Sequence, residues 1–230
     1  SDLEGIIGDV RDIVISKKKA NWEIGISLKH NHFAVKHSRL SMSIDFCERW
    51  FKGKCSDTYF KQIAPIFDLL ETKKKQHKKW SEIKDKQNNI YVPVLNAFID
   101  EIKRSYEKDK KMPTKMVEYL LGKYDFYKVV SQDSKKRTTI QPFNFRGTLN
   151  QQFESKKPSI IIPKSALPTR LVNIEMKPSS STTVEMFFDN GWQFSFRIHS
   201  ASTYVETSLK FDVQLIGMPT SIIIINCEWE

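Results

Sequence analysis

The first apolar stretches of the chain follow the two-residue period of β-strands. Residues 10–15 (VRDIVI) and 22–30 (WEIGISLKH) alternate or run apolar and are rich in β-branched side chains, and the polar KKKAN between them is typical of a turn. We therefore predict a β-hairpin. Because side chains alternate along a strand, the second strand has an apolar face and a polar face, and the polar face carries Glu23, Gly25, Ser27 and Lys29.

The middle of the chain changes to a helical period. Aromatic and aliphatic residues recur at helical spacing over residues 46–70, and KGKCSD at 52–57 interrupts them, so we predict two helices with a capping turn between them. Residues 91–106 keep an apolar stripe that is typical of a helix, and residues 113–121 predict a further one.

From residue 126 onward the chain returns to short segments of strand type, separated by Asn, Gly, Pro and Ser turns. We predict strands within YDFYKVV, TTIQPFNF, SIIIPK, RLVNIEMK, TTVEMFF, WQFSFRIHSAS, SLKFDVQLI and SIIIINCEW. The DNG at 189–191 predicts a tight hairpin. The pattern as a whole indicates an α/β (α+β) protein with a mixed sheet flanked by helices, divided into residues 1–125 and a β-rich region at 126–230.

Charge narrows the class of partner. The 230 residues include 37 Lys and Arg against 27 Asp and Glu, a formal net charge of +10, which suits a polyanion or an anionic membrane surface. No apolar run approaches the ~20 residues that span a bilayer, so nucleic acid is favoured. The basic stretch at 72–86 is then either a solvated helix face or a helix that faces phosphates.

Cysteine usage indicates a reducing compartment. Cys47, Cys55 and Cys227 are odd in number and lack CxxC spacing, which argues against a disulfide framework and against a zinc site. We expect a cytoplasmic protein without a signal peptide. The start SDLEG lacks a methionine and suits the C-terminal part of a longer protein, whose other residues could complete the site.

Acidic side chains on the predicted hairpin indicate metal chemistry. Asp12 opens the apolar first strand and is the expected principal metal ligand, Asp9 is the reserve, and Glu23 completes the metal environment or orients water. Hard cations such as Mg²⁺ prefer carboxylate oxygens, and a bound ion polarises a phosphodiester and lowers the pKa of an attacking water. Lys29 is expected to stabilise charge or help to activate the water, and Ser27 to make a smaller contribution.

The hairpin is similar to the PD-(D/E)xK nuclease arrangement, with departures. No proline precedes either aspartate, the tripeptide is Ser27-Leu28-Lys29, and Glu23 lies four residues upstream of Ser27 on the same face. The acid-x-Lys pattern alone is not specific, because a lysine-rich chain also yields it at Glu71, Glu82, Glu101 and Glu175. The combination of an upstream acid, a same-face partner and the basic cluster that follows distinguishes the hairpin.

That cluster, KHNHFAVKHSRLS at 29–41, concentrates imidazole and cationic side chains. A zinc site is disfavoured because the histidines lack a cysteine or carboxylate at ligand spacing and sit among cations. Such donors suit phosphates and base edges, so DNA contact is the preferred interpretation, with ordinary loop or cap roles as the alternative. The expected DNA-binding residues here are His30, Asn31, His32, Lys36, His37 and Arg39.

Several stretches together resemble the HaeIII family of type II restriction endonucleases. They are GDVRDIVI, WEIGISLKHNHFAVKHSRLS, PIFDLL, FDVQLIGMP and SIIIINCEWE, spread over most of the chain. The resemblance implies a PD-(D/E)xK-like restriction endonuclease core and Mg²⁺-dependent cleavage of double-stranded DNA at GGCC. It also implies a cognate cytosine DNA methyltransferase that protects the host genome, as a functional and not a physical partner.

A G·C target favours Arg and Lys, which donate to guanine O6 and N7. In the β-rich half, the region expected to recognise the target, the candidates are Arg146, Arg170 and Arg197, each with a solvated strand or loop position as the alternative. His199 is either a site residue or a hydrogen-bonded strand histidine. The tryptophans are expected to be core or helix anchors: Trp22, Trp50, Trp80, Trp192 and Trp229.

Other functions are left open. A catalytically silent DNA-binding protein would behave the same without metal, and a structure-selective repair nuclease would cut branched or damaged DNA without sequence preference. An RNA-binding module is disfavoured because the β-rich half lacks the aromatic-glycine pattern of common RNA modules. The sequence does not decide between a homodimer and a monomer, and it does not give the number of metal ions.

Overall fold

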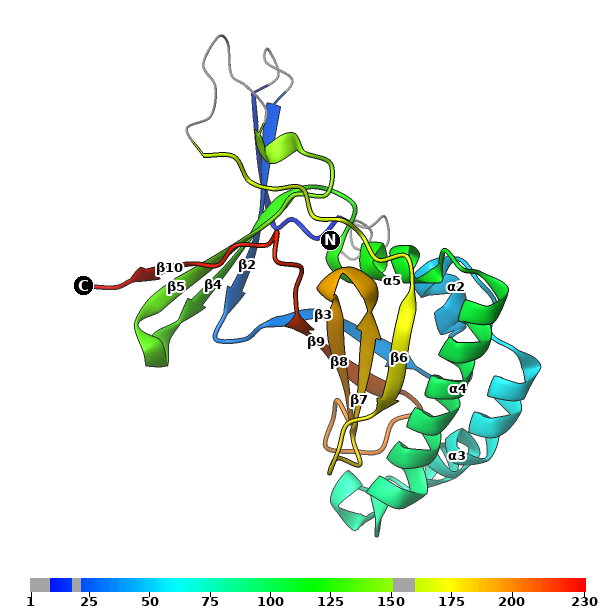
Figure 1. Ribbon diagram of the computed structural model, residues 1–230. Coiled ribbons are helices and arrows are strands. Elements are labelled where there is room, and N and C mark those ends of the chain that lie inside the picture. Colours follow the sequence, from blue (N-terminus) through cyan, green and yellow to red (C-terminus); the bar gives the residue numbers. More distant parts are fainter. Residues whose placement is uncertain (1–8, 18–21, 151–159) are drawn as a thin grey trace. The chain divides into compact units, whose positions relative to one another are not determined.

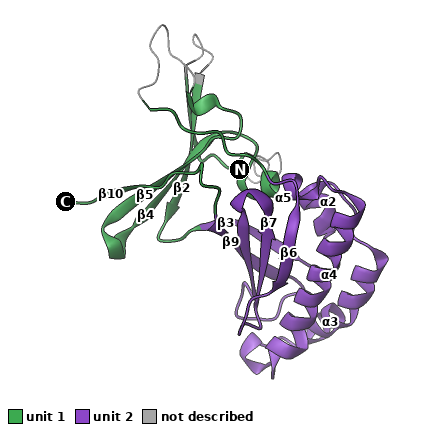
Figure 2. Ribbon diagram, in the orientation of Figure 1, with its two compact units in different colours: residues 1–33, 117–167, 218–230 green, residues 34–116, 168–217 purple. Residues whose placement is uncertain are grey.

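The computed structural model describes residues 9–17, 22–150 and 160–230. The chain forms two compact units (Figures 1 and 2), unit 1 with residues 1–33, 117–167 and 218–230 and unit 2 with residues 34–116 and 168–217. The units are interleaved along the sequence rather than divided at residue 125. Each contains a five-stranded sheet, and each sheet takes strands from both halves of the chain, in keeping with the predicted mixed α+β class.

The sheet of unit 1 is mixed. Its order is β1-β2-β4-β5-β10, with the bounds Ile13–Lys17, Trp22–His30, Phe126–Gln132, Arg137–Phe143 and Ile225–Glu228. Strands β1 and β2 pair antiparallel, which confirms the predicted hairpin, although its turn residues 18–21 lie outside the described residues. Strands β2 and β4 run parallel, whereas β5 pairs antiparallel with β4 and with β10.

The sheet of unit 2 is antiparallel. Its order is β3-β9-β8-β7-β6, with the bounds Ala34–Leu40, Leu209–Gly217, Gln193–His199, Thr183–Phe188 and Leu171–Met176. The predicted hairpin at 189–191 joins β7 to β8 and is confirmed. Alternate residues of β8 and β9 are buried, among them Phe196 and Phe211, which gives this sheet one apolar face.

Helices of unit 2 pack on that apolar face (Figure 1). They are α2 (Phe46–Phe51) and α4 (Val92–Lys108), and α3 (Asp57–Lys75) packs against α4. Trp50 of α2 stacks on Phe196, with ring centroids 5.9 Å apart, and Phe98 of α4 lies 5.1 Å from Phe211. Aromatic rings at these separations bury large apolar areas and prefer defined angles, so the aromatic cluster fixes both helices on the sheet.

Local signals in the sequence set the helix ends. Asp45 accepts a hydrogen bond from the amide of Glu48 at the start of α2, and Ser56 accepts one from Tyr59 at the start of α3. Helix α5 (Met112–Leu121) ends at a glycine with positive φ, Gly122. The predicted helices are confirmed, but α3 stops at Lys75, so most of the basic stretch at 72–86 lies beyond it in short turns.

Two expectations about strands and tryptophans are wrong. Residues 160–164 of SIIIPK form no strand, because the side chains of Asn144 and Asn150 bond the backbone of Ile162 in place of a neighbouring strand. Trp229 is not a core anchor, since it is 39% exposed and its indole donates to Thr138 beside the edge strand β10. By contrast, Trp50, Trp80 and Trp192 are buried as expected; the side chain of Trp22 lies outside the described residues.

Adjacent leucines of α3 give a matched test of the unit 2 core. Leu70 is fully buried, whereas Leu69 is 37% exposed. We expect Leu70→Ala to lower the free energy of unfolding by about 2–5 kcal/mol and Leu69→Ala to lower it by less than about 1 kcal/mol. Urea unfolding followed by circular dichroism measures both, and equal losses would contradict the packing of α3.

Candidate active site

The hairpin brings three of the predicted catalytic residues together. Ile13 pairs with Ile26 in the register of β1 on β2, and the amide of Asp12 donates to the carbonyl of Ile26 at 2.8 Å. Asp12, one residue before β1, therefore lies beside Ser27. Its carboxylate accepts hydrogen bonds from the amide of Leu28 at 2.6 Å and from the hydroxyl of Ser27 at 3.2 Å.

The third member is Lys29, whose Nζ lies 3.9 Å from Oδ2 of Asp12. The Asp12 side chain is 48% exposed and that of Lys29 is 25% exposed. The two charges are therefore close enough to attract each other, while the carboxylate keeps an open side toward solvent. A half-exposed carboxylate held by an amide and a hydroxyl is oriented before any ligand arrives.

A second lysine, which sequence reasoning missed, extends the polar row. Lys128 of β4 is in register with Ser27 across the parallel pair, is 4% exposed, and donates to the carbonyl of Phe33 at 2.8 Å. Burial, the larger cause, and the nearby charge of Lys29 together lower its pKa to about 8. Asp12, Ser27 and Lys128 thus form a row across three strands. The signal was a lysine at an inward position of YDFYKVV, between the buried Phe126 and Val130.

The other two predicted acids contact Arg11 instead of Asp12. The Arg11 guanidinium donates to Asp9 at 2.8 and 2.7 Å and to Glu23 at 2.5 Å. These bonds raise the pKa of Arg11, and hydrogen bonding from Arg11 is the largest cause that lowers the pKa of Asp9. Glu23 lies four residues along β2 from Ser27, roughly 13 Å.

The structure therefore does not assemble the expected three-acid metal set. Among the described residues, Asp9, Asp12 and Glu23 are not a group whose ligand atoms all lie within 4.8 Å of one another. Their role as joint metal ligands stays a prediction, and in this structure Asp9 and Glu23 hold an arginine.

Gly25 leaves room for the Arg11 side chain, whose bonds to Asp9 and Glu23 we call the Arg11 clamp. The Arg11 side chain is 7% exposed and crosses β2 at Gly25, where a Cβ atom would lie 2.0 Å from Cδ of Arg11. The guanidinium also lies 4.3 Å above the ring of Tyr124, and that of Arg146 lies 4.9 Å from the same ring. Because Arg11 immediately precedes Asp12, the clamp fixes the chain at the entry of the candidate site.

The basic cluster at 29–41 is divided between the two units. In unit 1, His30 lies 3.0 Å from the hydroxyl of Ser131 and 3.1 Å from Asp133. Asn31 has positive φ, donates to Asp133 and accepts from the amide of Asp133, and the exposed His32 follows it. These residues form a turn whose tip is open to solvent.

In unit 2 the remainder of the cluster lies on β3, where it joins a polar sheet face. His37, Asp212 and Arg197 are in register across β3, β9 and β8, and Asp212 lies 3.8 Å from His37 and 3.3 Å from Arg197. The next row of the same face carries Arg39, Lys210 and His199. Arg197 is 60% exposed. Basic side chains therefore gather around Asp212 on the β3, β9 and β8 part of the sheet face opposite to the aromatic core.

The remaining candidates lie elsewhere. Lys36 of β3 is partly buried, and burial lowers its pKa to about 8. Arg170 is exposed at the start of β6, where its amide donates to Asp189. Arg146 belongs to unit 1, beside Tyr124, and its amide donates to the buried Asp125. Arg146 and Arg170 thus belong to different units.

The donors at Asp12 fit a hard divalent cation. Mg²⁺ keeps several waters and is commonly bound through one or two carboxylates together with substrate phosphates. One exposed carboxylate beside a hydroxyl, with Lys29 and Lys128 nearby, supplies oxygen ligands and a cationic setting for a phosphate. Zinc sites in proteins are built mainly from His and Cys, and the row of Asp12, Ser27 and Lys128 contains neither.

Comparison with known proteins gives consistent results. A family model described as "HaeIII restriction endonuclease" matches residues 1–219. The Type II restriction enzyme HaeIII of Haemophilus aegyptius is 55% identical over 231 residues, which span 100% of this chain and 73% of that protein. No solved structure matches the chain. Among the helices in the described residues, none has the length and apolar character needed to cross a membrane.

A double-mutant cycle tests the clamp. We expect Gly25→Ala to lower the free energy of unfolding by about 1–3 kcal/mol, because the new methyl group displaces Arg11. In an Arg11→Ala background the same change should cost much less, so that the two substitutions are non-additive by about 1 kcal/mol or more. Chemical unfolding of the four proteins measures the coupling, and strictly additive losses would refute a contact between Arg11 and Gly25.

Proposed function

The chain belongs to the HaeIII restriction endonuclease family and is a type II restriction endonuclease, and on that premise we propose that it cleaves double-stranded DNA at GGCC with Mg²⁺ as cofactor. The observation that carries the catalytic part of the proposal is the contact of Asp12 with Ser27, Leu28 and Lys29 on one hairpin. The GGCC target rests on the family resemblance of the sequence.

Asp12 would hold the Mg²⁺ ion through its exposed carboxylate. When bound, the ion polarises the scissile phosphodiester and lowers the pKa of the attacking water. The amide of Leu28 and the hydroxyl of Ser27 keep the Asp12 carboxylate in one orientation. Because that orientation exists before substrate binds, little reorganisation is needed during the reaction.

Lys29 and Lys128 provide the positive charge on the same sheet face. Lys29 lies beside Asp12. With the metal ion held by Asp12 and the phosphate held by the ion, the Lys29 ammonium group would stabilise the added negative charge of the pentavalent transition state. The Lys128 ammonium group donates to the Phe33 carbonyl, which holds it in the row of Asp12, Ser27 and Lys128. It adds a fixed charge behind Ser27. Glu23 and Asp9 act through Arg11, which holds the chain next to Asp12.

DNA contact is proposed for both units. The hairpin end of unit 1 offers His30, Asn31 and His32, and the polar sheet face of unit 2 offers His37, Arg39 and Arg197 together with Lys210. Exposed guanidinium groups donate to guanine O6 and N7, which suits a target made of G·C pairs. Lys36, Arg146 and Arg170 are assigned to contacts with the DNA backbone, where position matters less than charge.

The biological setting follows from the same proposal. A cognate cytosine methyltransferase would protect host GGCC sites in a bacterial cytoplasm, and the endonuclease would cut DNA whose GGCC sites are unmethylated. GGCC is palindromic, so a homodimer would present the same surface to each half-site. A repair nuclease would instead cut by DNA shape, and a silent DNA-binding protein would not cut at all.

Digestion of a long unmethylated DNA with Mg²⁺ tests the catalytic assignment. We expect discrete fragments that end at GGCC, no cleavage in EDTA, a rate about a thousandfold lower for Asp12→Ala and at least about a hundredfold lower for Lys29→Ala. Glu23→Gln should lose less than about tenfold, because its partner is Arg11. If Glu23→Gln lowers the cleavage rate as much as Asp12→Ala does, Glu23 is a metal ligand and not only a partner of Arg11. Cleavage without sequence preference would favour a repair nuclease.

The sheet face of unit 2 has its own test. Arg197→Ala should weaken binding of a GGCC duplex by about 1–3 kcal/mol, measured by fluorescence anisotropy in Ca²⁺ at fixed salt. Lys103 on α4 is an exposed cation of the same unit away from this face, and Lys103→Ala is the matched control with no expected change. Equal effects of both substitutions would mean that only total charge matters.

A further inference from the structure

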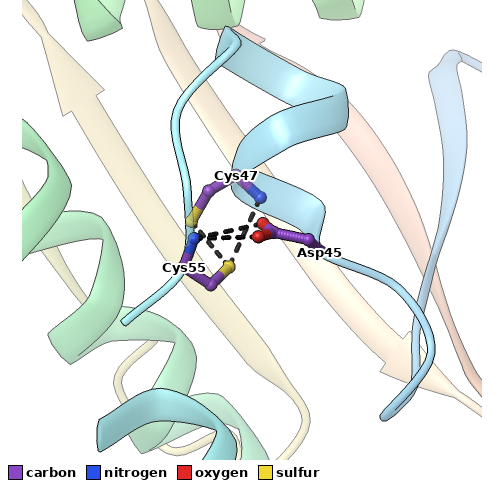
Figure 3. A group of neighbouring side chains, drawn as sticks. All are labelled: Asp45, Cys47 and Cys55. Carbon is purple, nitrogen blue, oxygen red and sulfur yellow. Dashed lines mark hydrogen bonds between the residues drawn. The ribbon is translucent and has the colours of Figure 1, made fainter. Parts of the chain in front are cut away.

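Two buried cysteines meet at the turn between α2 and α3 (Figure 3). Cys47 lies in the first turn of α2 and is fully buried, and Cys55 precedes α3 and is 2% exposed. Their sulfur atoms are 2.7 Å apart, and the amide of Cys47 lies 3.4 Å from Sγ of Cys55. Cys227, in contrast, is exposed. The sequence suggested no role for the pair, because their spacing matches no known motif.

The backbone holds the two sulfurs in contact. Helix α2 ends at Lys52 in the left-handed region, and the amide of Gly53 donates to the carbonyl of Cys47, which turns the chain back on the helix. The carboxylate of Asp45 accepts from the amides of Glu48 and Cys55, at 3.1 Å each. One side chain therefore fastens both the start of α2 and the segment that carries Cys55.

Asp45, Cys47 and Cys55 have the composition of a metal site, since their ligand atoms all lie within 4.8 Å of one another. The geometry does not suit a metal. Two sulfurs on a tetrahedral zinc ion with Zn–S bonds near 2.3 Å would be about 3.8 Å apart, and the Asp45 oxygens are already engaged by backbone amides.

The nearest additional acid does not complete a metal site either. Glu101 lies 4.0 Å from the Cys47 sulfur, but its oxygens accept from the amide and hydroxyl of Ser56 and from Arg104. A fourth ligand could be recruited only by breaking these bonds inside the core.

We propose that Cys47 and Cys55 are a covalent modification site, at which a small peroxide converts the two thiols to an intramolecular disulfide. Burial of both sulfurs selects an oxidant of about the size of water over bulky disulfides such as oxidised glutathione. The Cys55 thiol donates to the Cys47 sulfur, which makes Cys47 the sulfur that reacts first.

The chemistry balances with hydrogen peroxide as the oxidant. The Cys47 thiolate attacks one peroxide oxygen, the O–O bond breaks, and the departing hydroxide leaves as water after taking up a proton, so that Cys47 becomes a sulfenic acid. The Cys55 sulfur then attacks the Cys47 sulfur, the S–S bond forms, the S–O bond breaks, and a second water leaves. Two thiols lose two electrons and two hydrogens, and one peroxide is reduced to two waters.

The environment sets the rates of these steps. The hydrogen bond to Cys47 and burial raise the pKa of the Cys55 thiol, so Cys55 stays a thiol while Cys47 reacts with the peroxide. The first step is slow because both sulfurs are buried and the oxidant must reach the core. The second step needs no diffusion, because the sulfurs already touch. The pair is thus resistant to accidental oxidation but closes once it is oxidised.

The test uses the full chain and a Cys227→Ser background, in which the exposed thiol is absent. After treatment with hydrogen peroxide we expect this protein to lose two hydrogens in intact mass and both maleimide-reactive thiols in denaturant. Its melting temperature should rise by roughly 5 °C, reversibly with dithiothreitol. Added Cys47→Ser or Cys55→Ser should abolish the loss of hydrogen and the rise in melting temperature, and should give oxygen adducts on the remaining cysteine instead.

The unmodified chain supplies the control, because its Cys227 reports that the oxidant is active. Two reactive thiols that persist after Cys227 has been oxidised would overturn the proposal. A zinc ion retained at one per chain by the purified reduced protein would overturn it in favour of a metal site. No DNA is involved, so either result leaves the assignment of the nuclease unaffected.

Discussion

The candidate site depends on one guanidinium group. Arg11 is almost completely buried and holds Asp9 and Glu23 at the same time, with its aliphatic part lying on Gly25 and its charge over Tyr124. A buried cation is tolerated only when it is paired and hydrogen-bonded, and two carboxylates satisfy this one. As a result the backbone just before Asp12 has a single arrangement, and the register of β1 on β2 carries the Asp12 carboxylate to the amide of Leu28.

A second constraint is the parallel pairing of β2 with β4. It brings Lys128 beside Ser27, so that Lys29 and Lys128 both lie on the sheet face that carries Ser27. Two cations and one carboxylate on this face suit a phosphate that binds together with a divalent ion, because the phosphate and the ion together complement both signs of charge. In the function that we propose, this part of the sheet would bind a metal ion and a phosphodiester together.

The local part of this arrangement could be predicted from the sequence. The two-residue period gave the hairpin, and the alternation of faces put Ser27 and Lys29 on one side, near an acid that opens the first strand. It could not show that the Arg11 side chain crosses β2 at Gly25, so the pairing of Glu23 with Arg11 was not predicted. Lys128 was missed because its neighbour Ser27 is far away in sequence, and no local pattern reports a parallel pairing. The basic cluster at 29–41 looked continuous, but the chain leaves one unit for the other within it.

The interleaving of the two units has a consequence for how such an enzyme could change its target during evolution. Unit 2 is supplied by residues 34–116 and 168–217, and unit 1 by the segments around them. A single recombination crossover therefore cannot exchange one unit for a homologous one as a cassette; it would produce sheets assembled from strands of two parents. Substitutions on an existing strand face, by contrast, leave both sheets and the hairpin that carries Asp12 intact.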